Sequence, residues 1–200
     1  MKRRALLAGL MSSLAAGAAL AQGRRPATPG QFTGPFYPVG DVPLRPDLTT
    51  FDGGTALGQI MDLTGRVIDR NGQAIRDARI VFWQSDAQGI YRHDKDDRAA
   101  QIDTNFAGFG AVAVREDGTY SLRTILPVPY TGRPPHIHAR VSVGRDDALT
   151  TQIYLDGQES ENGLLFRVLS SFYGDRRRLT IAPMQGGPGL RAEFDLVLDL

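Results

Sequence analysis

The sequence contains no cysteine among its 200 residues. Disulfide bridges, thiolate zinc sites, iron–sulfur clusters and cysteine nucleophiles are therefore all excluded. Any metal bound by this protein must be held by histidine, tyrosine, aspartate or glutamate. Histidine is also scarce, with three in the chain, and two of the three stand together in His136-Ile137-His138.

The chain has little net charge, because 23 Lys and Arg residues oppose 22 Asp and Glu residues. Three of the basic residues, Lys2, Arg3 and Arg4, belong to a leader segment. Without that leader, 20 basic residues face 22 acidic ones, which is a net charge of −2. A domain this close to neutral has no electrostatic reason to bind nucleic acid or an anionic membrane as its main partner.

Residues 1–21 have the pattern of a secretory signal peptide. A basic start is followed by apolar Ala5–Leu20, and Ala19-Leu20-Ala21 is a small-residue cleavage signal. The apolar stretch is short and rich in Ala and Gly, so we expect no stable membrane anchor and a periplasmic or secreted protein. Arg3-Arg4 also fits twin-arginine export, and the sequence leaves both export routes open.

The remaining chain predicts an all-β domain of residues 60–200, preceded by an extended N-terminal arm of residues 22–59. The arm is rich in proline and glycine, which argues against regular structure. Asn71-Gly72 is a strong hairpin signal, and one weakly helical segment spans Gly163–Phe172. The predicted strands are Ile60–Asp69, Ala78–Gln84, Phe109–Val114, Gly118–Ile125, His136–Val143, Leu149–Leu155, Arg178–Ile181 and Leu190–Leu200. About eight strands at short spacing predict an antiparallel β-sandwich with long loops.

His136 and His138 are the first candidates for chemistry. Side chains two positions apart on a strand project from the same face, so both imidazoles point to one place while Ile137 and Ala139 face a core. Two imidazoles form half of a metal site, although a hydrogen-bonded surface pair gives the same pattern. Pro134 and Pro135 stiffen the approach to the strand.

Several short motifs together resemble the intradiol ring-cleavage dioxygenases, and most of all the β-chain type of protocatechuate 3,4-dioxygenase. The resemblance covers nearly all of the chain after the leader and implies a prealbumin-like sandwich. The order and spacing of its tyrosines and histidines are specific. The motifs are Gly34-Pro35-Phe36-Tyr37, Thr64-Gly65-Arg66-Val67, Ala78 to Trp83-Gln84, Gly89-x-Tyr91, Pro129-Tyr130, Arg133-Pro134-Pro135-His136-Ile137-His138 and Thr151-Gln152-Ile153-Tyr154.

The resemblance implies an Fe(III) ion held by Tyr91, Tyr130, His136 and His138, with Tyr130 and His138 axial and a solvent hydroxide as the fifth ligand. It places Arg133 and Gln152 beside the reacting ring, which makes Tyr130, Arg133 and Gln152 the candidate catalytic residues. A catechol-type substrate would chelate the iron as a dianion, and the displaced Tyr130 and hydroxide would take up its two protons. Attack by O2 would then open the ring to a muconate-type diacid.

The physical chemistry of this ligand set is consistent. A free tyrosine has a pKa of about 10, but a bound trivalent cation deprotonates it. Two phenolates and a hydroxide offset the charge of Fe(III), which suits a partly apolar pocket. An Fe(II) site of two histidines and one carboxylate remains an alternative, since Asp86 and Asp94 are available.

The resemblance is thinner around the pocket. The loop between Tyr130 and His136 is shorter than in the familiar protocatechuate enzymes, which leaves the catechol derivative undecided. Those enzymes line the site with a glycine–proline–aromatic segment of a second chain type. Here one chain carries both the ligands and Gly34, Pro35, Phe36 and Tyr37, the candidate substrate-binding residues. A self-contained pocket and a homo-oligomer both remain open.

Two rival functions come from other classes. Thr64 to Ala78 also resembles the prealbumin-like or carboxypeptidase-regulatory sandwich domains, which would make this a non-catalytic binding module. That reading explains the strands but not four ligand-type residues in order. A zinc hydrolase built on His136 and His138 is the other rival, and it lacks an obvious third ligand and general base.

Overall fold

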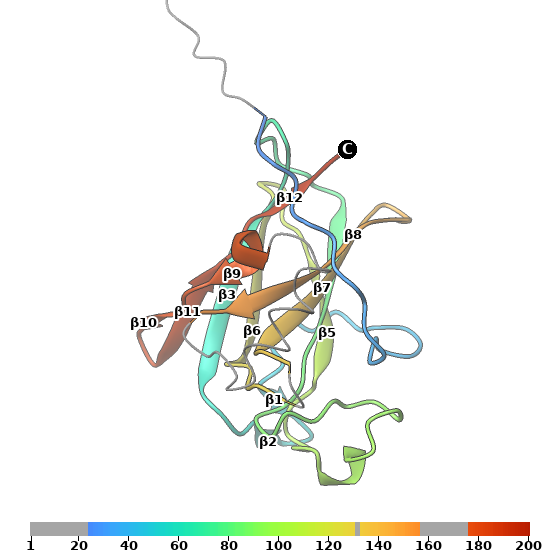
Figure 1. The fold of residues 1–200 in the computed structure, drawn as a ribbon, viewed down its shortest axis with the longest axis vertical. Coiled ribbons are helices and arrows are strands. Elements are labelled where there is room, and N and C mark those ends of the chain that lie inside the picture. The colour runs from blue at the N-terminus through green and yellow to red at the C-terminus, as the bar shows by residue number, and fades with distance from the viewer. Residues whose placement is uncertain (1–23, 131–132, 157–175) are drawn as a thin grey trace, which may run out of the picture.

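The computed structural model describes residues 24–130, 133–156 and 176–200. Within them the chain is an all-β sandwich of two main sheets (Figure 1). The predicted leader of residues 1–21 and the helical segment predicted at Gly163–Phe172 lie outside these residues. In the part of the chain that is described, no helix is long and apolar enough to cross a membrane.

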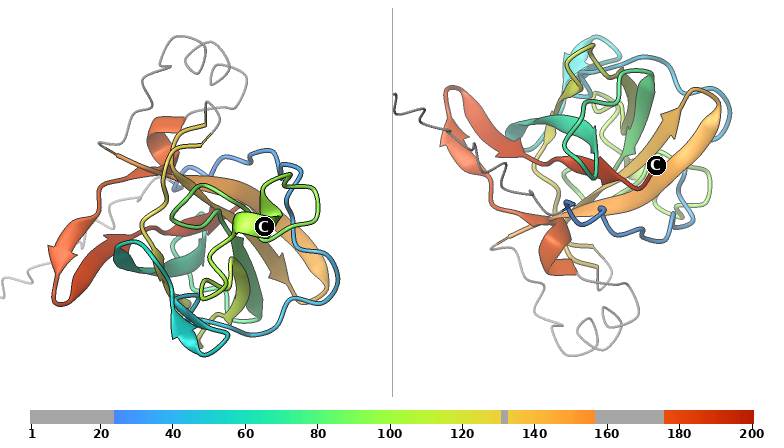
Figure 2. Two further views of the ribbon diagram at one scale, coloured as in Figure 1. Left: turned by 90° about the horizontal axis from the view of Figure 1, so that it is seen from below. Right: turned by 90° about the horizontal axis from the view of Figure 1, so that it is seen from above.

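The first sheet is built around β3 (Ile60–Asp69), the strand predicted with the same bounds. On one side β3 pairs antiparallel with β6 (Thr119–Ile125). On the other it pairs parallel with β11 (Gly189–Glu193) and then with β12 (Leu196–Leu198). A short β10 (Met184–Gly186) pairs with β11, and this hairpin projects beyond the body of the sandwich (Figure 2).

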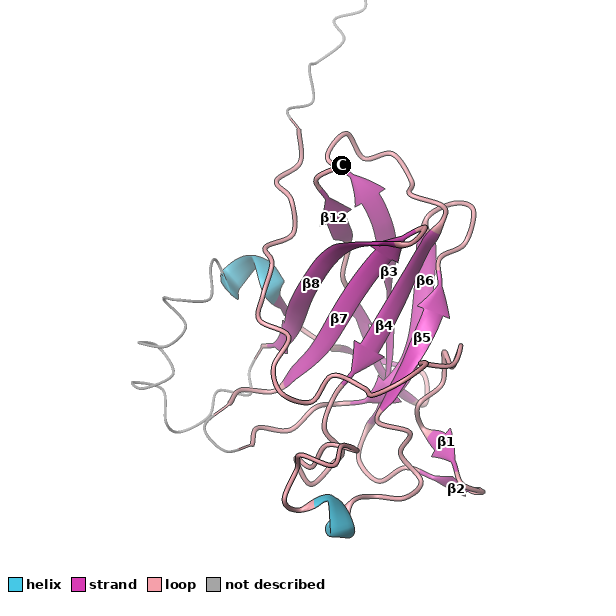
Figure 3. Cartoon of the chain, turned by 90° about the vertical axis from the view of Figure 1, so that its right-hand side faces the viewer, coloured by secondary structure: helices cyan, strands magenta, loops and turns pink. Residues whose placement is uncertain are grey.

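The second sheet has the order β5, β4, β7, β8, β9. Its central strands β4 (Ala78–Trp83), β7 (His136–Val143) and β8 (Asp146–Leu155) pair antiparallel, as does β5 (Phe109–Ala113) with β4. Figure 3 shows β8, β7, β4 and β5 side by side as one layer. β9 (Thr180–Ile181) follows a 3-10 helix at Arg176–Leu179 and pairs parallel with β8.

The structure corrects three details of the predicted strands. Asn71-Gly72 does form a turn, but the strands on either side of it lie in different sheets, so no extended hairpin follows. The sandwich is not wholly antiparallel, because β9, β11 and β12 pair parallel with their neighbours. The predicted last strand is two strands, β11 and β12, because strand pairing is interrupted at Phe194 and Asp195.

The N-terminal arm packs along the sandwich through main-chain hydrogen bonds. Thr28 donates to Val197, Gln31 to Thr150, and Arg45 to Ala111. Near its end, β1 (Thr50–Phe51) and β2 (Gly54–Thr55) form a small hairpin that the sequence did not predict. The arm therefore reaches both sheets.

The two faces of the second sheet have different roles. Its inner face, with Ile80, Phe82, Ile137 and Ala139, belongs to the main hydrophobic core between the sheets. The outer face carries a smaller cluster of Val42, Val81, Trp83, Tyr91 and Ala111, with Phe36, Tyr37, Phe109 and Tyr130 packed against it. Because strand side chains alternate, the histidines of β7 share this outer face with Trp83. The arm covers it.

Candidate active site

The two imidazoles of β7 face one another on the outer side of the sheet. The Nε2 atoms of His136 and His138 lie 3.1 Å apart, and both residues are buried. Ile137 and Ala139 point into the core, as the strand period predicted. The two Nε2 atoms are therefore close enough to bind one metal ion together.

The backbone before β7 sets the tautomer of His136. Its Nδ1 lies 2.7 Å from the carbonyl oxygen of Pro134. A carbonyl only accepts, so Nδ1 carries the proton and neutral His136 has its lone pair on Nε2. Pro134 thus leaves Nε2 of His136 able to bind a cation, and such outer hydrogen bonds commonly orient metal-bound imidazoles.

Both predicted tyrosines reach the same point. The hydroxyl of Tyr91 lies 3.4 Å from Nε2 of His136, and the hydroxyl of Tyr130 donates to that of Tyr91 over 3.2 Å. Tyr91 is buried on the long loop between β4 and β5, whereas Tyr130 is half-buried in the loop after β6. Tyr130 lies five residues beyond the end of β6. The four predicted ligands are brought together.

The electrostatics of the four groups suit a cation. Burial, followed by the neighbouring His136 and Arg133, holds the pKa of His138 well below its usual range, so this imidazole is neutral. Burial, followed by Tyr130, raises the pKa of Tyr91, and burial also raises the pKa of Tyr130. In the metal-free protein the two phenols therefore stay protonated beside a neutral His138.

Arg133 and Gln152 form one hydrogen-bonded unit beside the ligands. The guanidinium of Arg133 donates to Oε1 of Gln152 over 2.6 Å, and the hydroxyl of Tyr154 donates to the same oxygen over 3.0 Å. The amide of Gln152 donates to the carbonyl of Phe32 over 2.6 Å. Because Gln152 and Tyr154 pair in register with His138 and His136, all four side chains share the outer face.

The predicted substrate-binding segment of the arm lies against the ligands. A Cβ added to Gly34 would sit 3.5 Å from the His138 ring. Phe36 stacks on Tyr91 at 4.6 Å between ring centroids, and Tyr37 packs edge-on against Trp83 at 5.0 Å. Phe36 and Tyr37 therefore pack against rings of the site, namely those of Tyr91 and Trp83. One chain provides both the predicted ligands and this segment.

Trp83 and His93 are two further rings near the predicted ligands. Trp83 is buried and stacks on His138, with ring centroids 4.6 Å apart. Nδ1 of His93 accepts a hydrogen bond from the backbone of Lys95, and its ring lies 5.9 Å from that of Phe36. Trp83 therefore contacts a predicted ligand directly, whereas His93 lies at the edge of this cluster.

The carboxylate alternative finds no support in the described ranges. They contain no group of three or more His, Cys, Asp or Glu residues that could hold a metal ion. Asp86 instead accepts hydrogen bonds from the backbone of Gln88, Ile90 and Asp103. Among these residues neither the two-histidine, one-carboxylate iron site nor a three-ligand zinc site can be built.

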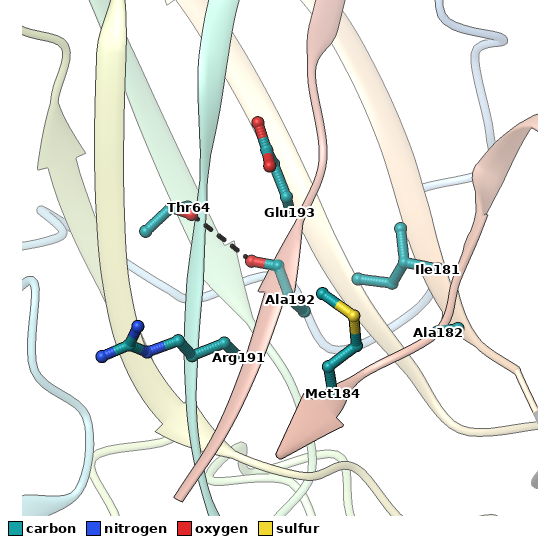
Figure 4. A pocket seen from close by; sticks show the side chains of 7 residues that line it. All are labelled: Thr64, Ile181, Ala182, Met184, Arg191, Ala192 and Glu193. Atoms are coloured by element: carbon teal, nitrogen blue, oxygen red, sulfur yellow. Dashed lines mark hydrogen bonds between the residues drawn. The ribbon is translucent and has the colours of Figure 1, made fainter. Parts of the chain in front are cut away.

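A cleft of about 440 Å³ lies elsewhere, between β3 and the β10–β11 hairpin. Figure 4 shows its lining, in which the hydroxyl of Thr64 donates to the carbonyl of Ala192 over 3.5 Å. Its walls are Thr64, Ile181, Ala182, Met184, Arg191, Ala192 and Glu193. None of the residues singled out from the sequence as catalytic, metal-binding or substrate-binding is among them.

Sequence reasoning missed several residues around the ligands. Asp96 accepts the backbone N–H of Tyr91 over 2.9 Å, and Arg98 donates to the carbonyl of Gly89 over 2.6 Å. Gln31 accepts from the hydroxyl of Tyr154 over 3.3 Å. Asp96 stands in a run of charged residues, a pattern typical of solvated surface. Of these residues only Gly89, which belongs to the Gly89-x-Tyr91 motif, could have been connected with the site from the sequence.

Comparisons with known proteins point to one enzyme family. A family model described as Dioxygenase matches residues 32–198. The chain is 33% identical to the protocatechuate 3,4-dioxygenase beta chain of Burkholderia cepacia over 82% of this chain and 76% of that one. It is 31% identical to hydroxyquinol 1,2-dioxygenase of Nocardioides simplex, covering 86% of this chain and 64% of that one.

A solved structure gives the same result. The dioxygenase domain of a dioxygenase carbohydrate-binding protein fusion from Streptomyces sp. SirexAA-E superposes with a TM-score of 0.68 at 32% identity. The match covers 88% of this chain and 99% of that domain. The likeness in sequence therefore extends to the whole sandwich.

Proposed function

The chain belongs to the intradiol ring-cleavage dioxygenase family, and on that premise we propose that it opens catechol-type aromatic rings with O2 at an Fe(III) ion held by Tyr91, Tyr130, His136 and His138. The product would be a muconate-type diacid. The observation that carries this proposal is the convergence of two phenol oxygens and two imidazole nitrogens within 3.1–3.4 Å of their neighbours. Since the family consists of enzymes, the rival reading as a non-catalytic sandwich module is wrong.

The residues present fit a hard trivalent cation. Nε2 of His136 has a free lone pair because Nδ1 donates to Pro134. Nδ1 of His138 has no hydrogen-bond partner among the described residues, so its proton can stay on Nδ1 while Nε2 faces the ligand cluster. Burial raises the pKa of both phenols, so neither has reason to ionise without a cation, and hard phenolate oxygens suit Fe(III).

A bound iron would favour the deprotonated phenols, would be chelated by both catechol oxygens and would withdraw electron density from the ring, which makes the ring reactive toward O2. The protein supplies the remaining functions. Tyr91 is buried and stacked on Phe36, which suits a permanent ligand. Tyr130 is half-buried on a loop, so its Oη is the better placed of the two to leave and to accept one substrate proton.

Arg133 provides positive charge at the site. Its charge opposes the rise in the pKa of both Tyr91 and Tyr130, and its backbone is hydrogen-bonded to that of Tyr130. A permanently charged guanidinium is suited to stabilise negative charge that develops on the substrate. Gln152 holds Arg133 in place through the 2.6 Å hydrogen bond, and the Phe32 carbonyl holds Gln152.

The N-terminal arm shields the site from solvent. Gly34, Phe36 and Tyr37 lie over His138, Tyr91 and Trp83, so the outer face of the sheet is covered by the same chain. Excluding water strengthens the electrostatic interactions within a site. We therefore propose that one chain builds a complete pocket and that O2 and a catecholic substrate are its small-molecule partners.

The test is to load the purified protein with Fe(III) and record its visible spectrum and O2 uptake. We expect a phenolate-to-iron charge-transfer band, O2 consumption with at least one member of a panel of catechol, protocatechuate and hydroxyquinol, and cleavage between the two hydroxyl-bearing carbons. Tyr91→Phe should weaken the band, whereas Tyr120→Phe, in the main core, should keep it. Extradiol products, or a colourless protein with a full complement of iron, would refute the proposal.

We also propose that residues 1–21 direct export and are removed before Gln22. The support is the basic, apolar and small-residue pattern of that segment. Expression of the full chain in a bacterium, followed by fractionation and N-terminal sequencing, tests it. A mature protein that begins at Gln22 in the periplasm or medium is expected, and a full-length cytoplasmic product would contradict it.

A further inference from the structure

Tyr91 stands on a long connection between β4 and β5 whose one regular element in the described chain is a 3-10 turn at Ala99–Gln101. A ligand on such a loop needs fixed support, because loops are the most mobile parts of a fold. The support comes from Asp96. One carboxylate oxygen accepts the backbone N–H of Tyr91 over 2.9 Å, and the other accepts the backbone N–H of Arg98 over 3.0 Å.

The side chain of Arg98 extends this support to the turn before Tyr91. Its guanidinium lies 3.4 Å from the Asp96 carboxylate and donates to the carbonyl of Gly89 over 2.6 Å. Asp96 and Arg98 therefore bind the backbone on both sides of Ile90, at the Gly89 carbonyl and at the Tyr91 N–H. The Asp96 carboxylate is buried, with 3% of its side chain exposed, whereas 37% of the Arg98 side chain is exposed. Losing a hydrogen-bond donor is therefore costly for the carboxylate.

The same turn touches the second tyrosine. Gly89 has φ +76°, and a Cβ added there would lie 2.8 Å from the Cβ of Tyr130. The backbone of Gly89 thus lies against the base of the Tyr130 side chain, while two residues later Tyr91 meets the Tyr130 hydroxyl at 3.2 Å. One short turn sets the distance between the two phenols.

We propose that Asp96 is a positioning residue for both tyrosines, acting on Tyr91 directly and on Tyr130 through Arg98 and Gly89. The inference rests on the proposed function, in which Tyr91 and Tyr130 bind the iron. Asp96 touches neither substrate nor metal in this scheme. It holds the two phenols at the separation that a single cation requires.

Asp96→Asn is the sharpest variant, because both carboxylate oxygens accept hydrogen bonds. An amide has one oxygen, so its NH2 group would face a donor at either Tyr91 or Arg98. Asp97→Asn is the matched control. It makes the same charge change one residue away, at a side chain that is 97% exposed and 4.0 Å from Arg98.

Two measurements distinguish positioning from general stability. In metal-free protein we expect hydrogen exchange to quicken about tenfold or more at the Tyr91 or the Arg98 amide in Asp96→Asn, since one of the two amides loses its buried acceptor. In iron-loaded protein we expect a shifted or weaker charge-transfer band per bound iron. We also expect kcat to fall on the order of 10- to 100-fold, with a smaller change in KM. Asp97→Asn should match the parent in all three.

The outcomes separate this inference from the proposed function. A parent protein without a charge-transfer band overturns the proposed function, and the positioning role for iron ligands with it. A parent with the band, and an Asp96→Asn variant equal to Asp97→Asn in exchange, band and kcat, overturns the positioning role alone. If Asp96→Asn does not fold, Arg98→Met takes its place, because it removes the link to Gly89 and leaves the carboxylate on Tyr91. An unchanged band in that variant would overturn the inference that Asp96 positions both tyrosines, because the link to Tyr130 runs through Arg98.

Discussion

Trp83 and His138 are cross-strand partners whose rings lie flat against one another, with centroids 4.6 Å apart and planes within 8°. The indole fills the space between the second sheet and Tyr37 of the arm. An imidazole that is stacked in this way has little freedom to rotate, which suits the proposed role of His138 as a ligand.

Replacing Trp83 by alanine should therefore destabilise the protein and loosen the site. We expect the free energy of unfolding to fall by about 3–5 kcal/mol, the usual cost of removing a large buried aromatic side chain. Trp83→Phe keeps a ring on His138 and should lose much less. Urea unfolding of metal-free protein measures the loss of stability. The rate of iron loss to a chelator measures how far the site has loosened. Equal unfolding midpoints for Trp83→Ala and the parent would show that the stack carries no energy.

Gly89→Ala should be costly for two reasons that a control can separate. The residue has φ +76°, which costs a side chain about 1–2 kcal/mol, and its new Cβ would meet Tyr130 at 2.8 Å. Gly53→Ala shares the backbone strain, with φ +79°, but meets nothing within 4 Å. Urea unfolding should show a clearly larger loss for Gly89→Ala, together with a changed charge-transfer band. Equal losses would mean that the contact with Tyr130 relaxes freely.

Gln152→Glu should weaken the contact between the arm and the site. The substitution puts a carboxylate oxygen where the amide donates to the Phe32 carbonyl, so two acceptors would face each other. An unsatisfied buried polar group typically costs about 1–3 kcal/mol. Urea unfolding measures this loss, and Gln59→Glu at an exposed position is the control. A loss no greater than that of the control would refute the role given to this hydrogen bond.

Alkaline pH should destabilise the sandwich through Tyr120. Burial raises the pKa of this phenol, whose hydroxyl donates to the carbonyl of Phe194 over 2.6 Å. The folded protein therefore keeps a proton that the unfolded chain releases above a pKa of about 10. The stabilisation is complete below that pH and is lost above it, by up to about 1.4 kcal/mol per pH unit.

Urea unfolding at about pH 8 and about pH 11 tests this prediction, with Tyr120→Phe for comparison. The variant should be less stable at the lower pH by about 1 kcal/mol, since it loses one hydrogen bond. Its stability should then fall less steeply toward the higher pH. Parallel pH profiles for the two proteins would rule Tyr120 out as the source.

The observed structure departs from the sequence prediction more in how the strands pair than in where they begin and end. Ile60–Asp69 was predicted with its observed bounds, because a run of alternating apolar residues is a local signal. The turn at Asn71-Gly72 is equally local, but the next strand crosses to the other sheet. Parallel pairing of β11 and β12 with β3 joins residues more than a hundred positions apart, and no short-range pattern encodes it.

The sequence by itself determined which residues are available for chemistry. Without cysteine, histidine, tyrosine, aspartate and glutamate remained as possible ligands, and the strand period placed both imidazoles of the one His-x-His pair on one face. The two tyrosines were implied by the family resemblance. Only the tertiary structure decided how Tyr91 and Tyr130 reach them and what holds them there. That depends on contacts such as Asp96 with the Tyr91 backbone and Gly89 with Tyr130. The physical reason is that a loop's position is set by the partners of its backbone groups, and these partners meet only when the whole chain has folded.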